Sequence, residues 1–305
     1  MVDLRVITLK CKTTEQVSAS LVRNGCAIYQ IAPDLVRTGE RVRGAAQDFF
    51  SKTPAEKAHS SAAGCLEGYL EFGAERDKIT GRPDLSESYR VWHRNQPRPD
   101  VKSWAADCLL HREMVAAYEP FVGLANDILE TLYRAVAEPL LKPTAALDLH
   151  SASYLQLNYS RPSEHARDTI TDLHEDGHLL TIIRPFGPGL AGAPGALVDV
   201  PNREQPAGRF RSSHSPVTVD LNDDEVLVIA SSPTYFLTGG LTPPYFHLVQ
   251  TSGLSSRLSL VFFVNPGRHG TLAPWRECDA SPVRDIHAVI DAVSYAHNTR
   301  HDWKI

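Results

Sequence analysis

The sequence has 305 residues, enough for one large domain or two small ones with a substantial buried core. Hydrophobic residues make up 42% and charged residues 22%, which excludes collagen-like, coiled-coil and disordered chains. A net charge of −5 and the lack of a basic stripe interleaved with aromatic residues argue against nucleic acid or an anionic membrane as a partner.

The cysteines and the first residues of the chain indicate in which cellular compartment the protein is expected. The five cysteines are scattered and contain no C-x-x-C pair, which argues against both a disulfide framework and a structural zinc site. The chain does not begin with a basic stretch followed by an apolar one, and no segment approaches the ~18 apolar residues of a membrane span. We therefore expect a soluble, unprocessed protein of the reducing cytoplasm.

The first half of the chain has mainly helical patterns. Apolar residues between Leu35 and Phe50 fall on one helical face, and residues 53–56 (Thr-Pro-Ala-Glu) form a capping box with proline at the first helical position. A longer helical pattern covers 113–138, and we expect Pro120 to kink it or offset its start. Residues 60–107 are rich in Gly, Pro and aromatic residues, which predicts loops over a surface.

The second half changes to short runs of Val, Ile, Leu, Phe and Tyr that are separated by turn-forming residues. Many short strands without intervening helices are typical of an antiparallel sandwich or barrel. A last helix is expected after Ser281-Pro282, a cap followed by proline at the first helical position. The predicted strands are 154–157, 179–184, 196–200, 217–219, 226–230, 246–250 and 258–264.

We expect one compact unit in three parts. These are a helical or mixed region over 1–150, a β core over 151–270 and a C-terminal helix within 271–305 that packs on the core. No internal repeat or low-complexity linker divides them.

One histidine is followed two places later by aspartate, at His174 and Asp176. Residues i and i+2 share a face in a strand, whereas in a helix they lie about 200° apart. The pair precedes the strand-like run 179–183, so it supplies two ligands for a metal that prefers nitrogen and oxygen donors. A surface or hydrogen-bonded structural role is the alternative.

A third ligand has to come from a different strand. His247 lies in the apolar run 245–249, where an unpartnered imidazole would be costly to bury, although a hydrogen-bonded core histidine is the alternative. A Thr-Gly-Gly turn precedes it at 238–240, and Arg257 and Ser259 follow at the head of the next strand. A guanidinium beside a hydroxyl on one strand face is a good receptor for a carboxylate.

This order of H-x-D, turn, distal histidine and R-x-S resembles the isopenicillin N synthase-like family of iron(II)/2-oxoglutarate oxygenases. The resemblance extends over most of the chain and is specific for the family rather than for a substrate. Matching segments are 21–29 ("L...G.F.V.NHGI" in the family), 49–57 ("FF.LP.EEK"), 68–69 ("GY"), 84–89 ("D.KE.Y") and 155–159 ("LR.NYYP").

The resemblance implies a mainly β fold with flanking helices, in which a double-stranded β-helix, or jelly roll, forms a catalytic core over 151–270. Region 1–150 would correspond to the family's N-terminal domain. The implied metal is iron(II), held by His174, Asp176 and His247, with 2-oxoglutarate and O2 as cosubstrates. Because the carboxylate ligand is present as Asp176, a halogenase is disfavoured.

The implied cosubstrate contacts are Arg257 and Ser259, which would bind the far carboxylate of 2-oxoglutarate, together with Asn158. The second tyrosine of the family's N-Y-Y-P motif is replaced by Ser160. Loops over the site and a histidine beside the metal-binding pair give three candidate substrate contacts. These are Tyr69, Arg90 and His178.

The implied activity is hydroxylation or another oxidation, such as desaturation or cyclisation, of a small-molecule metabolite, with release of succinate and CO2. We expect a role in specialised metabolism. Two alternatives stay open: an iron(II) oxidase that does not use 2-oxoglutarate, and a jelly-roll binding protein without turnover.

Overall fold

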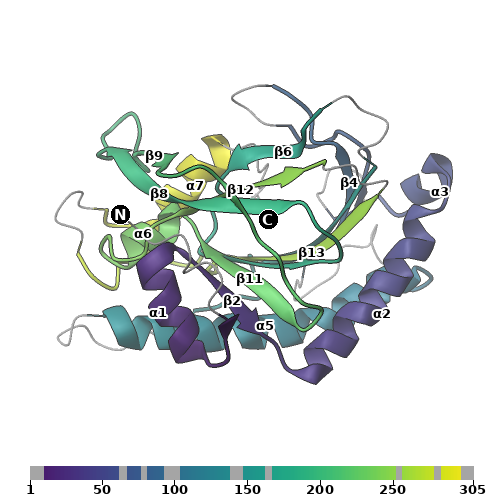
Figure 1. Cartoon of the computed structure of the whole chain (residues 1–305), viewed down its shortest axis with the longest axis horizontal. Helices are drawn as coiled ribbons and strands as arrows, with labels where there is room; N and C mark the ends of the chain where they lie inside the picture. Colours follow the sequence, from purple (N-terminus) through teal and green to yellow (C-terminus); the bar gives the residue numbers. More distant parts are fainter. Residues whose placement is uncertain are drawn as a thin grey trace.

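Two β-sheets lie one over the other, and three helices cover the outer side of the larger sheet, in the lower part of Figure 1. These helices are α1 (Thr14–Asn24), α2 (Pro33–Phe50) and α5 (Leu109–Val136), and α5 packs against both others. None of the helices in the described part of the chain is both long and apolar enough to cross a bilayer. The computed structural model describes residues 10–61, 67–76, 81–92, 104–137, 147–161, 167–251, 256–277 and 283–296.

The larger sheet has eight strands, and all its pairings are antiparallel except that of β1 with β2. In spatial order its strands are β1 (Lys10–Cys11), β2 (Cys26–Gln30), β11 (Glu225–Ala230), β7 (Leu180–Pro185), β13 (Arg257–Val264), β5 (Tyr154–Ser160), β4 (Ser86–Trp92) and β3 (Gly68–Leu70). The smaller sheet runs β10 (Val217–Thr218), β8 (Leu190–Asp199), β12 (Tyr245–Gln250) and β6 (Thr169–His174), with β9 (Arg209–Ser212) paired to β8.

From β5 onward the core strands alternate between the two sheets. Strands β5, β7, β11 and β13 belong to the larger sheet, while β6, β8 and β12 belong to the smaller one. The chain therefore winds between two facing sheets, which is the double-stranded β-helix. The predicted fold class, mainly β with flanking helices around a jelly roll, is confirmed.

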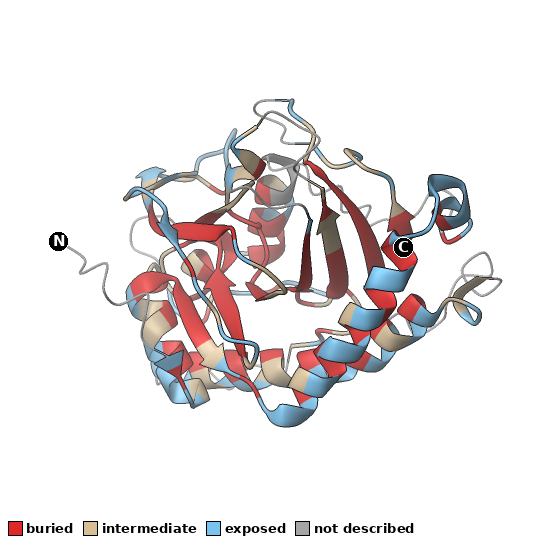
Figure 2. Ribbon diagram, turned by 45° about the vertical axis from the view of Figure 1, so that its right-hand side comes forward, coloured by how far each residue is buried: buried red, intermediate tan, exposed pale blue. Residues whose placement is uncertain are grey.

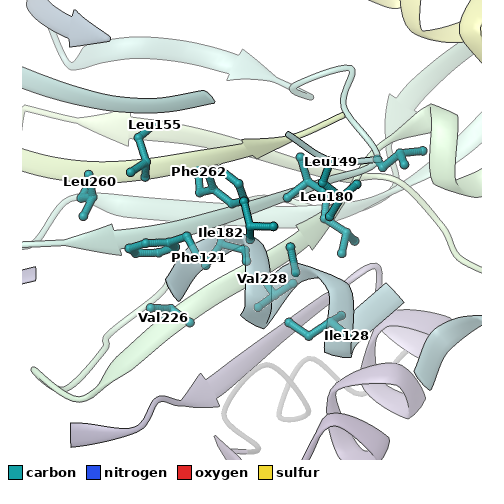
Figure 3. Packing of buried hydrophobic residues seen from close by; sticks show 14 of the residues in the cluster. Phe121, Ile128, Leu149, Leu155, Leu180, Ile182, Val226, Val228, Leu260 and Phe262 are labelled. Carbon is teal, nitrogen blue, oxygen red and sulfur yellow. The ribbon is translucent and has the colours of Figure 1, made fainter. Parts of the chain in front are cut away.

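Strand β13 shows how the core is divided. Leu260 and Phe262 point to the helix side, where they join the cluster that contains Phe121 and Ile128 of α5 (Figure 3). The alternate residues Val261 and Phe263 face the space between the sheets. Because successive side chains of a strand point to opposite faces, one strand closes the helix-side core and also lines the inner cavity. Strands β7, β11 and β13 in the middle of the larger sheet are almost entirely buried, and buried residues are red in Figure 2.

The predicted helices are present, and α5 differs from the prediction in where it starts. The capping box is present at α3 (Pro54–Ala58), where Thr53 Oγ1 accepts from Glu56 N–H and Glu56 accepts from Thr53 N–H. Helix α5 starts earlier than expected, so Pro120 lies inside it rather than at its start. Helix α7 (Ile286–Ala296) packs on α6 (Ser232–Leu237), whereas the expected cap at 281–282 lies outside the described residues.

The prediction of loops over 60–107 is wrong where β3 and β4 pair with each other and β4 pairs with β5. Strand β4 is buried along its whole length although it contains Ser, Glu and Arg. Its Glu87 accepts from Lys57 Nζ at 2.5 Å and from Tyr69 Oη at 2.6 Å, and both Lys57 and Glu87 are buried. Because internal partners satisfy its polar residues, this strand can be buried without the apolar residue pattern from which strands are predicted.

Gly39 on α2 lies against a buried arginine. The guanidinium of Arg184 donates to Val36 O at 2.9 Å, Glu40 Oε1 at 2.7 Å and Asp223 O at 3.1 Å, which fixes its position. A Cβ added at Gly39 would lie 1.5 Å from Arg184 Nη1.

We therefore predict that Gly39→Ala lowers the free energy of unfolding by roughly 1–3 kcal/mol, because the arginine has to leave its partners or the helix has to shift. Gly44→Ala on the same helix is the matched control, since its Cβ would meet nothing within 4 Å. The control should be neutral or stabilising by up to about 1 kcal/mol. Urea denaturation measures both, and equal stabilities of the two variants would contradict the packing described here.

Candidate metal centre and carboxylate site

Three potential metal ligands meet between the two sheets. His174 is the last residue of β6 and lies opposite His247 in the β6–β12 pairing. Asp176 Oδ1 is 3.3 Å from His174 Nε2 and 3.7 Å from His247 Nε2. One donor atom from each residue lies within 4.8 Å of the others. Two imidazoles and a carboxylate therefore converge from three segments.

The reason for this convergence differs from the one expected. We predicted that His174 and Asp176 share the face of one strand, but β6 ends at His174 and Asp176 lies in the connection to β7. The intervening Glu175 is buried and accepts hydrogen bonds from Ser232 N–H at 2.7 Å and Ser232 Oγ at 2.6 Å. This anchor at the start of α6 and a positive φ of 71° at Gly177 turn the chain so that Asp176 comes back toward His174.

Hydrogen bonding orients the first imidazole for metal binding. His174 Nδ1 is 2.7 Å from the backbone oxygen of Asp172, so Nδ1 carries the hydrogen and Nε2 faces the other two residues. Among the described residues, Asp176 Oδ2 and His247 Nδ1 are buried without a hydrogen-bond partner. Two nitrogen donors and one oxygen donor at the wall of a cavity suit iron(II).

The charges at the centre also favour a bound cation. Burial alone would lower the pKa of His174, but the hydrogen bond and the negative charge of Asp176 outweigh it and raise the pKa to about 9. Burial likewise opposes ionisation of Asp176, yet the nearby His247 and His174 hold its pKa well below the usual range. A metal ion at the centre would therefore take the place of the proton on His174.

A buried arginine, Arg257, lies on β13 and lines the same cavity. Arg257 is 5% exposed, and it donates to Pro188 O at 3.0 Å and to Ser259 Oγ at 3.2 Å. Among the described residues no acidic side chain pairs with it. Burial lowers the pKa of Arg257 to about 10, so the guanidinium is still charged at neutral pH. A buried cation without a counter-ion is costly, so an anion bound beside Arg257 would stabilise it.

Asn158 lies next to Ser259 in the larger sheet. It pairs with Ser259 across β5 and β13, and its Oδ1 accepts from Gln156 Nε2 at 2.6 Å, which leaves its amide NH2 available to a ligand. Arg257, Ser259 and Asn158 line the cavity that also contains the three potential ligands.

None of the three predicted substrate contacts belongs to the wall of the cavity that the described residues form. Tyr69 donates from its hydroxyl to Glu87, and Arg90 hydrogen-bonds with Gln156 and Glu75. His178 is fully buried, with Nδ1 2.9 Å from an oxygen of Asn265. Each of these polar groups has an internal partner. The cavity wall instead contains Glu75, Asp84, Gln156 and Glu175, which sequence reasoning missed.

Comparison with known proteins gives the fold. No family model and no curated protein matches the chain. Solved structures do match: a full-length Neurospora crassa protein in complex with alpha-KG has a TM-score of 0.65 at 14% identity, covering 92% of this chain and 90% of that one. The rice dioxygenase for auxin oxidation has a TM-score of 0.62 at 17% identity, with 85% and 79% covered.

The dioxygenase for auxin oxidation 1 from Arabidopsis thaliana, solved with 2-oxoglutarate, has a TM-score of 0.61 at 17% identity, covering 88% of this chain and 91% of that one. At these identities the likeness shows the fold alone. The chain therefore shares the double-stranded β-helix fold of these solved structures, which is the fold that the predicted resemblance implies. It also carries a His-Asp-His cluster that can hold a metal.

We predict that Glu175→Ala weakens metal binding by roughly tenfold or more, because the segment between His174 and Asp176 loses its anchor. The unpaired Ser232 N–H should also lower the free energy of unfolding by about 1–3 kcal/mol. Glu113→Ala, which removes only an ion pair with the exposed Arg41, is the control and should change neither property by more than about 1 kcal/mol. Manganese(II) titration and urea unfolding measure the two effects. Wild-type metal affinity in Glu175→Ala would show that Glu175 does not position the ligands.

Proposed function

We propose that this protein is an iron(II)- and 2-oxoglutarate-dependent oxygenase that oxidises a small organic molecule and releases succinate and CO2. The observation that carries the proposal is the buried, unpaired Arg257 in the same cavity as the three-ligand cluster. A metal centre alone fits many activities. A metal centre with a buried guanidinium for an anion fits a cosubstrate that binds through the metal at one end and through a carboxylate at the other.

The residues have separate roles in this proposal. His174, Asp176 and His247 hold iron(II) from one side, and when bound the iron supplies the redox chemistry with O2. Arg257 and Ser259 bind the far carboxylate of 2-oxoglutarate.

Neighbouring side chains complete the cosubstrate site. The amide of Asn158, next to Ser259 in the cavity wall, would donate a hydrogen bond to 2-oxoglutarate. The apolar residues Leu190, Val249 and Val261 line the same cavity and keep water from the bound cosubstrate. The alpha-KG in the Neurospora crassa structure and the 2-oxoglutarate in the Arabidopsis thaliana structure support this cosubstrate.

The finer parts of the proposal concern the substrate and its setting. In this more detailed proposal, the protein hydroxylates, desaturates or cyclises a metabolite of specialised metabolism and does so in the cytoplasm. The enclosed position of the centre between two sheets supports a small molecule rather than a macromolecule as the substrate.

The direct test incubates the iron(II)-loaded protein with 2-oxoglutarate and a metabolite library, and follows succinate and O2 together. We expect a responding metabolite to give equal amounts of succinate formed and O2 consumed. O2 uptake without 2-oxoglutarate would instead identify an oxidase. No turnover, together with an absorption spectrum that anaerobic 2-oxoglutarate leaves unchanged, would identify a binding protein.

We predict that Arg257→Leu weakens 2-oxoglutarate binding by roughly 10²–10³-fold, because a buried carboxylate loses its ionic partner. Anaerobic titration of the iron(II) protein, followed by visible absorption, gives the affinity. The control is Arg209→Leu, since Arg209 is exposed and pairs with Asp199 on the β8–β9 hairpin. An Arg257→Leu affinity equal to that of the control would remove Arg257 from the cosubstrate site.

A further inference from the structure

Strands β4, β5 and β13 carry a chain of hydrogen bonds that leads to the proposed cosubstrate site. Strand register places Arg90 opposite Gln156, and Asn158 opposite Ser259. Gln156 and Asn158 are two residues apart on β5, so their side chains lie on the same face of the sheet. Both of them line the cavity, whereas the buried Arg90 does not.

The buried arginine determines which way the amide of Gln156 points. A guanidinium has N–H donors and no acceptor, so the atom of Gln156 that faces Arg90 Nε has to be the oxygen, Oε1. Glu75, which pairs with Arg90, accepts from Gln156 Nε2 at 3.1 Å, and a carboxylate there requires a donor. Two residues of opposite charge therefore hold the two ends of this amide.

The fixed amide of Gln156 in turn orients Asn158. Gln156 Nε2 donates to Asn158 Oδ1 at 2.6 Å. Because its oxygen is turned toward Gln156, Asn158 has its NH2 group on the other side of its amide, and none of the described residues accepts a hydrogen bond from that group. The chain of hydrogen bonds that begins at Arg90 thus ends in an N–H donor in the wall of the cavity.

A second arginine sets the direction of the neighbouring hydroxyl. Ser259 Oγ accepts from Arg257 Nη1 at 3.2 Å, which leaves the hydroxyl hydrogen of Ser259 for a ligand. Arg257, Ser259 and Asn158 consequently all present donors. A group of donors suits a ligand that offers only acceptors, such as a carboxylate.

We infer that Gln156 is a positioning residue for cosubstrate binding: held by Arg90 and Glu75, it keeps the NH2 group of Asn158 directed at 2-oxoglutarate. This inference rests on the proposed oxygenase function and adds to it a residue that acts through Asn158. Without Gln156, the amide of Asn158 is free to turn over. Its oxygen would then face the acceptor atoms of the cosubstrate, and a hydrogen bond would be lost.

The test is a double-mutant cycle of Gln156→Met and Asn158→Ala, with 2-oxoglutarate affinity measured by anaerobic titration of the iron(II) protein. Asn158→Ala should weaken binding roughly tenfold, the loss of one hydrogen bond to a charged ligand. Gln156→Met keeps the side-chain length and removes both hydrogen-bonding atoms, so it should weaken binding about three- to tenfold. The double variant should bind within about twofold of Asn158→Ala alone, because the two residues act as one unit.

The matched control is Gln205→Met, since Gln205 is exposed, donates to Gly208 O and does not line the cavity. It should bind 2-oxoglutarate as the wild type does. Manganese(II) titration of each variant checks that the protein is folded around an intact metal centre. If Gln156→Met does not fold, the cycle is repeated with Gln156→Thr, whose β-branched side chain suits a strand.

Two results would overturn the inference: an affinity of Gln156→Met equal to that of the control, or losses that multiply in the double variant. The second result would show that Gln156 acts independently of Asn158. The wild-type titration separates this inference from the proposed function. If the wild type binds no 2-oxoglutarate, the oxygenase function fails; if it binds 2-oxoglutarate and Gln156→Met binds it equally well, only the role of Gln156 fails.

Discussion

The antiparallel register between β6 and β12 is the constraint on which the site depends. It places His247 opposite His174, and a shift by one residue would turn His247 away from the cavity because side chains alternate along a strand. The register of β13 with β5 does the same for Arg257 and Ser259, which share the cavity-facing positions with Val261 and Phe263. The pairing of strands in a packed jelly roll thus fixes the positions of both imidazoles and of Arg257 and Ser259.

Buried charges fall into two groups, and the difference separates structure from function. Lys57 with Glu87, and Arg184 with Glu40 and two backbone oxygens, are paired inside the protein. Arg257 lines the cavity without a partner of opposite charge among the described residues. Since an unpaired buried charge lowers stability, its presence at a cavity indicates a ligand that supplies the counter-charge.

Much of the β core could be predicted from the sequence because strands such as β11 and β13 are continuous apolar runs. The H-x-D pair, the distal histidine and R-x-S could also be identified, because their spacing relative to such runs is visible in the sequence. Strand β4 could not, since Glu87 and Arg90 are stabilised by partners distant in sequence. Arg90 and His178, which the sequence predicts as substrate contacts, likewise have partners inside the protein.

The place of Asp84 in the cavity wall could not be predicted from the sequence. It belongs to the segment 84–89 that resembles the family, but only the folded chain shows that it lines the cavity. Gln156 could have been found, since it is two residues before Asn158 on a strand and therefore shares its face.

The most direct test of the central claim is a crystal structure of the protein prepared anaerobically with iron(II) and 2-oxoglutarate, with data collected at the iron absorption edge. We expect one anomalous peak bonded to His174, Asp176 and His247, and a 2-oxoglutarate molecule whose far carboxylate contacts Arg257 and Ser259. Iron bound elsewhere, or a carboxylate placed away from Arg257, would contradict the account.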